Sequence, residues 1–311
     1  MLNQLRPLLF KRFNSSAIKW KLTDSIKQPK YDTGCTCCQP KLPQDKQINF
    51  DQPLNKSSAI PERHIMALTT DSNKMEQFDS KIENMPGTLA HKIHELKSRL
   101  VMKPGVSVSS IVLKNHNDVL KGFGVDSSGG TNEQLVFIYP DMKAIKFDLD
   151  HTDQFLKKYN LLETNQQEVY NPFLTSKQKE ELQKKNNEND ITVVDSNFEE
   201  VPIRKDLIVT CGHAKRDIRC GELGPLITNE FDQVLKSKGL ADETYLGEIT
   251  HIGGHAFAGN VLYYPKQSKS SRDFIWYGRV FPQMVQSLVD DTIVNKLIVK
   301  ELFRGDLSKY E

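Results

Sequence analysis

Two cysteines and two histidines in the C-terminal third of the chain have the types and spacing of a metal-ligand set. Eight residues separate Cys211 from Cys220, and three separate His251 from His255. Thiolate sulfur and imidazole nitrogen suit zinc, copper and iron-sulfur centres, whereas calcium and magnesium take oxygen ligands. Cysteines and histidines that cluster in this way are candidates for metal binding or catalysis. The four residues therefore predict a metal centre.

Zinc and an iron-sulfur cluster are the two centres that this set fits best. Zinc-finger cysteines stand about two to four residues apart, whereas the longer segment here, with Arg216 and Arg219, is expected to form a basic loop. Gly253 and Gly254 would cost a helix bearing the histidines about 2 kcal/mol, so a loop is expected there. Glycine in that loop lets the backbone approach a bulky centre and its inorganic sulfide. A [2Fe-2S] cluster is favoured, and a zinc-stabilised binding module is the alternative.

Polar residues near the cysteines have more than one interpretation. His213, two residues after Cys211, is a hydrogen-bond donor to the centre, a rival ligand or a partly exposed loop residue. Arg216 and Arg219 would offset negative charge or dock an acidic partner, and solvated loop arginines fit the sequence equally well. Asp217 is placed to pair with one of the two arginines.

A thiol-disulfide oxidoreductase that uses Cys211 and Cys220 directly is the second functional hypothesis. Reactive pairs normally have two intervening residues, so the eight found here are a poor geometry for a fast reversible disulfide. Cys35, Cys37 and Cys38 lie in a Gly-, Thr- and Pro-containing stretch, an exposed setting in which thiols exchange disulfides. Unpaired thiols or a second weak metal site are the other interpretations of these three. The odd cysteine count does not indicate a secreted disulfide scaffold.

Alternating strand and helix patterns surround the four predicted ligands. A short buried strand ends at Cys211, and Pro225 is expected to open an amphipathic helix. A second long helix is expected to start at Pro282 and to end before Gly305. The expected strands are Leu207–Thr210, Thr244–Thr250, Phe257–Tyr264 and Phe274–Val280. This order fits a thioredoxin-like α/β domain with Cys211 just past the carboxyl end of its first strand.

Three motifs between residues 200 and 300 resemble those of the sucrase/ferredoxin-like family. They are Cys211-Gly-His213-x2-Arg216-Asp217-x-Arg219-Cys220, His251-x-Gly253-Gly254-His255 and Trp276-Tyr277-Gly278-Arg279-Val280. The pattern of the whole chain is similar to the mitochondrial branch of that family in fungi. The resemblance implies a thioredoxin-like ferredoxin fold, unlike that of Rieske domains, and a [2Fe-2S] cluster. Its implied ligands are Cys211, Cys220, His251 and His255.

Histidine ligation has a consequence for redox chemistry. Two neutral imidazoles in place of two thiolates make an electron easier to accept, so the reduction potential should exceed that of an all-cysteine ferredoxin. Each ligating histidine keeps a second ring nitrogen whose proton responds to the charge of the centre. A pH-dependent reduction potential is therefore expected.

The N-terminal half has a mixed α/β pattern without a catalytic constellation. Helices are expected at Leu89–Leu100 and Thr152–Tyr159, and strands at Val106–Lys114, Gln134–Tyr139 and Ala144–Phe147. The glycines between the first two strands indicate a long loop or turn. The expected organisation is a transit peptide (1–24), an extended lead-in (25–60), a mixed α/β domain (61–174), a polar linker (175–192) and the thioredoxin-like [2Fe-2S] domain (193–311).

Composition and the N-terminal segment bear on location and partners. Lysine and arginine total 42 against 40 acidic residues, so the net charge of +2 gives no reason to expect nucleic-acid binding. No apolar run approaches the roughly 20 residues of a membrane span. Residues 1–23 are basic, free of acids and amphipathic, as in a mitochondrial transit peptide. A basic disordered tail is the alternative. We expect a mitochondrial protein, in the matrix or alternatively the intermembrane space, for electron transfer or thiol quality control with an unidentified redox partner protein.

Overall fold

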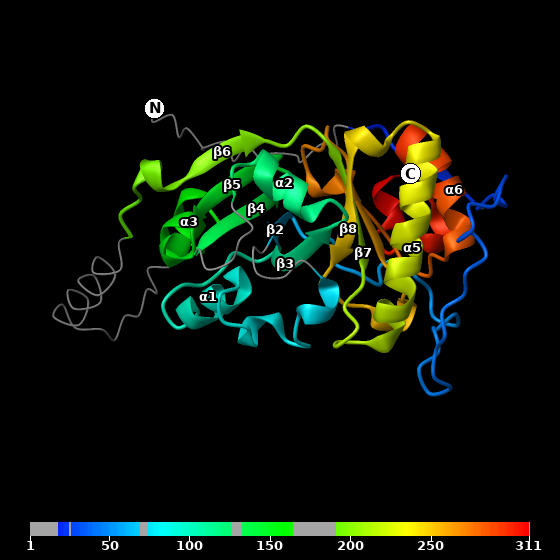
Figure 1. Cartoon of the computed structure of the whole chain (residues 1–311), viewed down its shortest axis with the longest axis horizontal. Coiled ribbons are helices and arrows are strands. Elements are labelled where there is room, and N and C mark those ends of the chain that lie inside the picture. Colours follow the sequence, from blue (N-terminus) through cyan, green and yellow to red (C-terminus); the bar gives the residue numbers. More distant parts are fainter. Residues whose placement is uncertain (1–17, 25, 69–73, 126–131, 164–190, 311) are drawn as a thin grey trace, which may run out of the picture.

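The computed structural model describes residues 18–24, 26–68, 74–125, 132–163 and 191–310 (Figure 1). Most of the expected transit peptide, and the expected linker up to residue 190, lie outside the described residues. Residues 18–24, which the sequence assigned to the transit peptide, belong to the fold. Trp20 is buried there, and Lys21–Thr23 forms a strand with a segment near the C-terminus.

A nine-stranded mixed sheet in the order β10-β9-β7-β8-β3-β2-β4-β5-β6 is the centre of the described structure. Its strands are β2 (Arg63–Leu68), β3 (Val106–Leu113), β4 (Glu133–Tyr139), β5 (Lys143–Asp148), β6 (Glu199–Pro202), β7 (Asp206–Cys211), β8 (Thr244–Ile249), β9 (Val261–Tyr264) and β10 (Ile275–Tyr277). A separate parallel pair joins β1 (Lys21–Thr23) to β11 (Leu297–Val299). The α-helices are α1 (Leu89–Leu96), α2 (His116–Gly122), α3 (Thr152–Lys158), α5 (Ile218–Ser237) and α6 (Val285–Leu288). The predicted mixed α/β class is confirmed.

The same strand pattern occurs twice in this sheet. In the first half, β2 pairs parallel with β3 and antiparallel with β4, which pairs antiparallel with β5. In the second half, β7 pairs parallel with β8 and antiparallel with β9, which pairs antiparallel with β10. The halves meet where β3 and β8 pair antiparallel, with Val112 opposite Glu248. A Cβ at Gly247 would overlap the carbonyl oxygen of Val112, so glycine allows this close junction. The two halves thus share one continuous sheet.

Successive side chains of a strand point to opposite faces of the sheet, so the first half has a hydrophobic cluster on each face. Ile65 and Ala67 of β2 face the side covered by α1 and α3, together with Phe155 of α3. Met66 and Leu68 face the opposite side and join the large core that extends into the second half. In that half α5 packs against β7 and β8, and α6 packs against α5 (Figure 1).

The structure corrects the predicted start of the helix that follows β7. Helix α5 begins at Ile218, because the Asp217 side chain caps it by accepting a hydrogen bond from the Arg219 backbone N–H. Pro225 therefore lies inside the helix and does not open it. Cys220 lies in the first turn of α5, and the predicted basic loop is shortened to the few residues before the cap.

Other element boundaries also differ from the prediction. The helix from Pro282 continues through α6 into a π-helical turn that ends at Val294, and Lys296 then takes a left-handed φ of 56°. The chain next pairs as β11 with β1, a long-range partner that periodicity does not reveal. Helix α1 ends at Leu96, and the region expected as a loop before β4 contains α2. Strands β2 and β6 were missed, the latter because it has only four residues, of which two are glutamates and three are exposed.

The described residues of the lead-in before β2 form no helix or strand, and they are bound to the C-terminal half. The Lys27 backbone N–H donates to Ser287 Oγ at 3.0 Å, and Thr36 Oγ1 donates to the buried Glu230 at 2.8 Å. Farther along, the Asn49 N–H donates to the carbonyl oxygen of Ala256 at 2.8 Å. The lead-in therefore runs across the elements that carry the candidate ligands.

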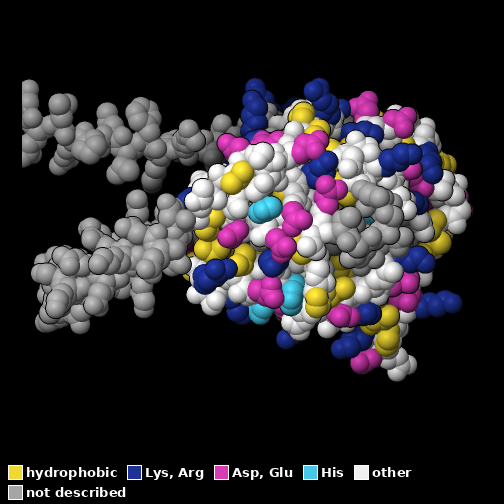
Figure 2. Space-filling model, turned by 60° about the vertical axis from the view of Figure 1, so that its left-hand side comes forward, with side chains coloured by type: hydrophobic (Ala, Val, Ile, Leu, Met, Phe, Trp, Pro, Cys, Tyr) yellow, Lys and Arg dark blue, Asp and Glu magenta, His cyan; other side chains and the backbone are white. Residues whose placement is uncertain are grey.

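The molecular surface carries both signs of charge. Lysine, arginine and acidic side chains are interspersed over the face in Figure 2, which agrees with the small net charge. Among the described residues, no helix combines the length and apolar character needed to cross a membrane.

Candidate metal centre

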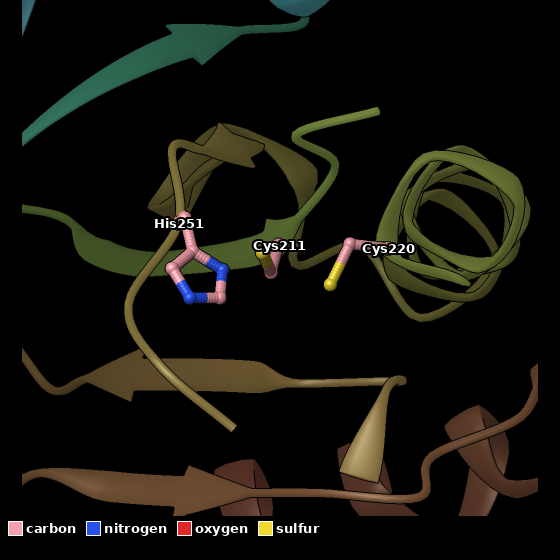
Figure 3. Close-up of side chains that lie close together, drawn as sticks. All are labelled: Cys211, Cys220 and His251. Carbon is pink, nitrogen blue, oxygen red and sulfur yellow. The ribbon is translucent and has the colours of Figure 1, made fainter. Parts of the chain in front are cut away.

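Three of the four predicted ligands converge at the end of the β7–β8 pair. Cys211 is the last residue of β7, Cys220 projects from the first turn of α5, and His251 follows β8. One potential ligand atom of each lies within 4.8 Å of those of the other two. A ring nitrogen of His251 points toward Cys211, and the sulfur of Cys220 points into the same space (Figure 3). Both cysteines are almost fully buried, with 2% and 1% of their surface exposed.

The fourth predicted ligand lies beside the third. The rings of His251 and His255 are tilted by 32°, with centroids 5.2 Å apart. His255 is not within the 4.8 Å group, and 43% of its side chain is exposed. The Nδ1 atoms of both histidines are nonetheless buried and lack a hydrogen-bond partner. An unpaired buried nitrogen is costly unless something binds it. Two sulfur and two nitrogen donors therefore fit a metal or cluster at this place.

The structure assigns His213 a positioning role. It is 1% exposed, so the interpretation as a partly exposed residue is wrong. Its Nε2 lies 2.9 Å from the carbonyl oxygen of Asp79, and its Nδ1 accepts a hydrogen bond of 3.1 Å from the His251 N–H. Burial lowers the pKa of His213, which keeps the ring neutral for these roles. Because both ring nitrogens are engaged in hydrogen bonds, His213 holds the backbone of the candidate ligand His251 and is not itself free to bind a metal.

The two buried thiols have different acidities. A hydrogen bond with Cys220 lowers the pKa of Cys211 well below its usual value, with further help from His251 and from the His213 backbone N–H. The same hydrogen bond, together with burial, raises the pKa of Cys220. Cys211 is thus the preferred thiolate, and Cys220 is the thiol that donates to it.

Charged residues beside the pair are themselves paired. Asp217 accepts two hydrogen bonds of 2.9 Å from the Arg219 guanidinium, which lowers the pKa of Asp217. Asp217 also lies 4.0 Å from Nε2 of His255. Arg219 donates in addition to the carbonyl oxygen of Gln47 in the lead-in at 3.1 Å. Arg219 is therefore a structural residue, whereas Arg216 is exposed.

Two buried residues that the sequence analysis missed hold the ligand backbone. The backbone carbonyl oxygen of Asn260 accepts a 2.9 Å hydrogen bond from the Cys211 N–H, and its side-chain amide donates to the Gly254 carbonyl at 3.1 Å. Arg304, 2% exposed, donates to Asn260 Oδ1 at 2.7 Å and to the Gly253 carbonyl at 3.2 Å. Neither residue has a spacing or composition signal that would have identified it.

A third missed residue, Glu248 of β8, lies behind Gly212. A Cβ at Gly212 would overlap the carboxyl group of Glu248. Burial, together with the charge of Cys211, raises the pKa of Glu248 to about 7. A carboxyl that titrates near neutrality thus lies close to the buried thiol pair.

The N-terminal cysteines lie on the lead-in and are not part of the centre. Cys35, Cys37 and Cys38 are unbridged, and Cys35 Sγ approaches the Leu226 carbonyl of α5 at 3.8 Å. Burial and the nearby Cys38 raise the pKa of Cys35 to about 12, which disfavours its thiolate. Cys37 is the exposed member of the three.

Comparison with known proteins places the chain in a family. Residues 54–305 match the model of the Sucrase/ferredoxin-like family. The chain belongs to this family. No solved structure matches it at a significant level.

Three proteins to which the chain is similar bear the name Altered inheritance of mitochondria protein 32. The one from Meyerozyma guilliermondii is 40% identical over 288 residues, which cover 92% of this chain and 95% of that protein. The one from Debaryomyces hansenii is 36% identical, with 89% and 94% covered. The one from Clavispora lusitaniae is 37% identical, with 91% and 94% covered. These names link the chain to mitochondria without identifying a compartment.

Proposed function

We propose that this chain binds a [2Fe-2S] cluster through Cys211, Cys220, His251 and His255 and that it transfers electrons in mitochondria. The observation that carries the proposal is the convergence of Cys211, Cys220 and His251 within 4.8 Å, beside a second histidine whose Nδ1 is also buried and unpartnered. The bound cluster would supply one-electron oxidation and reduction.

The protein's own residues suit such a centre. The first turn of α5 and the end of β7 present two sulfurs, while His213 holds the backbone of His251 by a hydrogen bond. Burial lowers the pKa of His255, so its ring is neutral and able to ligate at physiological pH. In the second half the strand order is β10-β9-β7-β8, and α5 connects the parallel strands β7 and β8 along the chain. This topology supports a thioredoxin-like ferredoxin domain.

A mitochondrial site of action is supported by the names of the relatives and by the basic N-terminal segment. We propose the matrix as the compartment. Because Trp20 is buried in the fold, removal of a presequence would have to occur before this residue if the packing is to be kept. The proposed role is electron transfer, or redox control of the thiols of other proteins, with a redox partner protein.

Iron and sulfide analysis of anaerobically purified protein tests the cluster. The expected result is a coloured protein that bleaches with dithionite and contains equal amounts of iron and sulfide. Replacing any of the four ligands, as in Cys211→Ser or His255→Ala, should lower the iron content. Cys37→Ser and His91→Ala are matched controls outside the centre and should leave it unchanged. A colourless protein that contains zinc would overturn the proposal in favour of a structural metal site.

Direct thiol chemistry is the second candidate function. It is favoured by the proximity of the Cys211 and Cys220 ligand atoms and by the lowered pKa of Cys211, the two features that a nucleophilic pair requires. Iron-free protein should then reduce a model disulfide, and Cys211→Ser should abolish this reaction. Equal rates in the wild type and in Cys211→Ser would exclude it.

A further inference from the structure

Arg304 is a buried arginine without an acidic partner. Its guanidinium donates to Asn260 Oδ1, to the Gly253 carbonyl and to Ser57 of the lead-in, and it lies 5.9 Å from the centre of the Phe257 ring. All these groups are neutral. Within the described ranges the hydrogen-bond partners of Arg304 include no carboxylate, although only 2% of this residue is exposed.

A buried charge of this kind needs compensation. Removing a guanidinium from water is costly unless a counter-charge and hydrogen bonds replace the lost solvation. Burial lowers the pKa of Arg304 to about 10, and the groups that act against this lowering are the thiols of Cys211 and Cys220. Hydrogen bonds to the Gly253 carbonyl and to Asn260, which accepts from the Cys211 N–H, hold the guanidinium against the segments that carry the candidate ligands, so the negative charge available to it is that of the centre.

The position of Arg304 relative to the histidine loop is equally specific. A Cβ at Gly254 would overlap Nη2 of Arg304, so the guanidinium lies directly against the backbone between His251 and His255. Through Asn260, the same side chain is linked to the backbone N–H of Cys211. Arg304 thus connects the histidine loop to the backbone of Cys211 from one buried position.

We propose that Arg304 is a positioning residue that supplies the counter-charge of the centre and holds the histidine loop in place. This inference rests on the proposed function. In a [2Fe-2S] centre two thiolates cancel the positive charge of the oxidised core, so one-electron reduction leaves a net negative charge among the ligands. A fixed positive charge next to the loop stabilises that reduced state and raises the reduction potential.

The test compares Arg304→Gln, Arg304→Lys and Arg63→Gln with the wild type. Arg63 lies in β2 and pairs with Asp141, so its replacement controls for the loss of one positive charge elsewhere. In dye-equilibrium titrations, Arg304→Gln is expected to lower the equilibrium constant for reduction at least tenfold, which corresponds to about 59 mV for one electron. Arg304→Lys should retain most of the potential, and Arg63→Gln all of it. A smaller change in Arg304→Gln, or equal losses in Gln and Lys, would overturn the inference.

A second measurement does not require the cluster. In iron-free protein with Cys35, Cys37 and Cys38 replaced by Ser, the ultraviolet absorbance of thiolate reports the charge on the remaining pair. At a pH low enough to keep most of the pair protonated, Arg304→Gln should reduce the thiolate about tenfold, the equivalent of one pKa unit, whereas Arg304→Lys should not. A wild type that binds no iron but shows this difference would refute the cluster and leave the counter-charge role in place. Equal thiolate in all variants would refute that role.

Discussion

Gly253 and Gly254 provide a matched pair of substitutions that separates backbone strain from contact with Arg304. Both have left-handed φ angles, 84° and 74°, so alanine is strained at either position. A Cβ at Gly253 would meet nothing within 4 Å, whereas a Cβ at Gly254 would overlap the guanidinium of Arg304. The two variants therefore share one penalty and differ in the other.

The expected destabilisation follows from these two penalties. Alanine in the left-handed region costs roughly 1–2 kcal/mol at either position. At Gly254 the Arg304 side chain must also move and weaken its hydrogen bonds to Asn260 and Gly253, and a hydrogen bond to a charged group contributes about 1.5–3 kcal/mol. Gly254→Ala should therefore be about 1.5–3 kcal/mol less stable than Gly253→Ala, and it should retain less iron.

Urea unfolding of the iron-free proteins measures this difference directly. Repeating both substitutions in an Arg304→Gln background completes a double-mutant cycle, in which the extra cost at Gly254 should shrink because the shorter side chain leaves room. Equal unfolding free energies for Gly253→Ala and Gly254→Ala would refute the reasoning. So would an extra cost at Gly254 that persists unchanged without Arg304.

Three further predictions concern protons and the lead-in. If histidines ligate a redox centre, reduction makes them more basic, so the reduction potential should fall as pH rises from about 6 to 9; voltammetry giving a flat line would exclude this, and His251→Cys should remove part of the slope. Burial lowers the pKa of His64 to about 3. Below about pH 6.5 the unfolded state therefore takes up a proton at this residue that the folded state does not. The unfolding free energy should drop by about 2 kcal/mol between pH 7 and 5. His64→Gln should lack that portion in urea titrations, and an unchanged pH dependence would contradict it. Glu230→Ala removes the hydrogen-bond acceptor of the Thr33 and Thr36 hydroxyls. The alkylation of Cys35, measured by mass spectrometry, should then be faster than in the wild type, with Cys37 as the internal control.

Local sequence patterns were sufficient for the parts of the site that lie on one element. The apolar run before Cys211 predicted a strand that is buried along its whole length. The glycines between the histidines predicted a loop, and both take left-handed φ angles that disfavour a helix. The strand–helix–strand order in the second half was also predicted correctly. In each case neighbouring residues determine the outcome.

The errors occur where a distant residue or a single side-chain hydrogen bond decides the structure. The Asp217 cap moves the start of α5 ahead of Pro225, so Cys220 is held by a helix and does not move with a loop. Strand β11 replaces the end of a predicted helix because β1, nearly the whole chain away, pairs with it. The role of Arg304 depends on segments around residues 57, 253 and 260, which only the folded chain brings together.

The arrangement of these residues makes the two sides of the centre different. The cysteine side is sealed between β7 and α5, with both thiols almost completely buried. The histidine side reaches the surface, where 43% of the His255 side chain is exposed and Arg216 lies near enough to influence its charge. An electron and a proton exchanged with a partner would both pass most readily through this edge, because it is the only side of the described ligand set with solvent access. Arg304 contacts the same loop, so its proposed counter-charge would act on the side where reduction would occur.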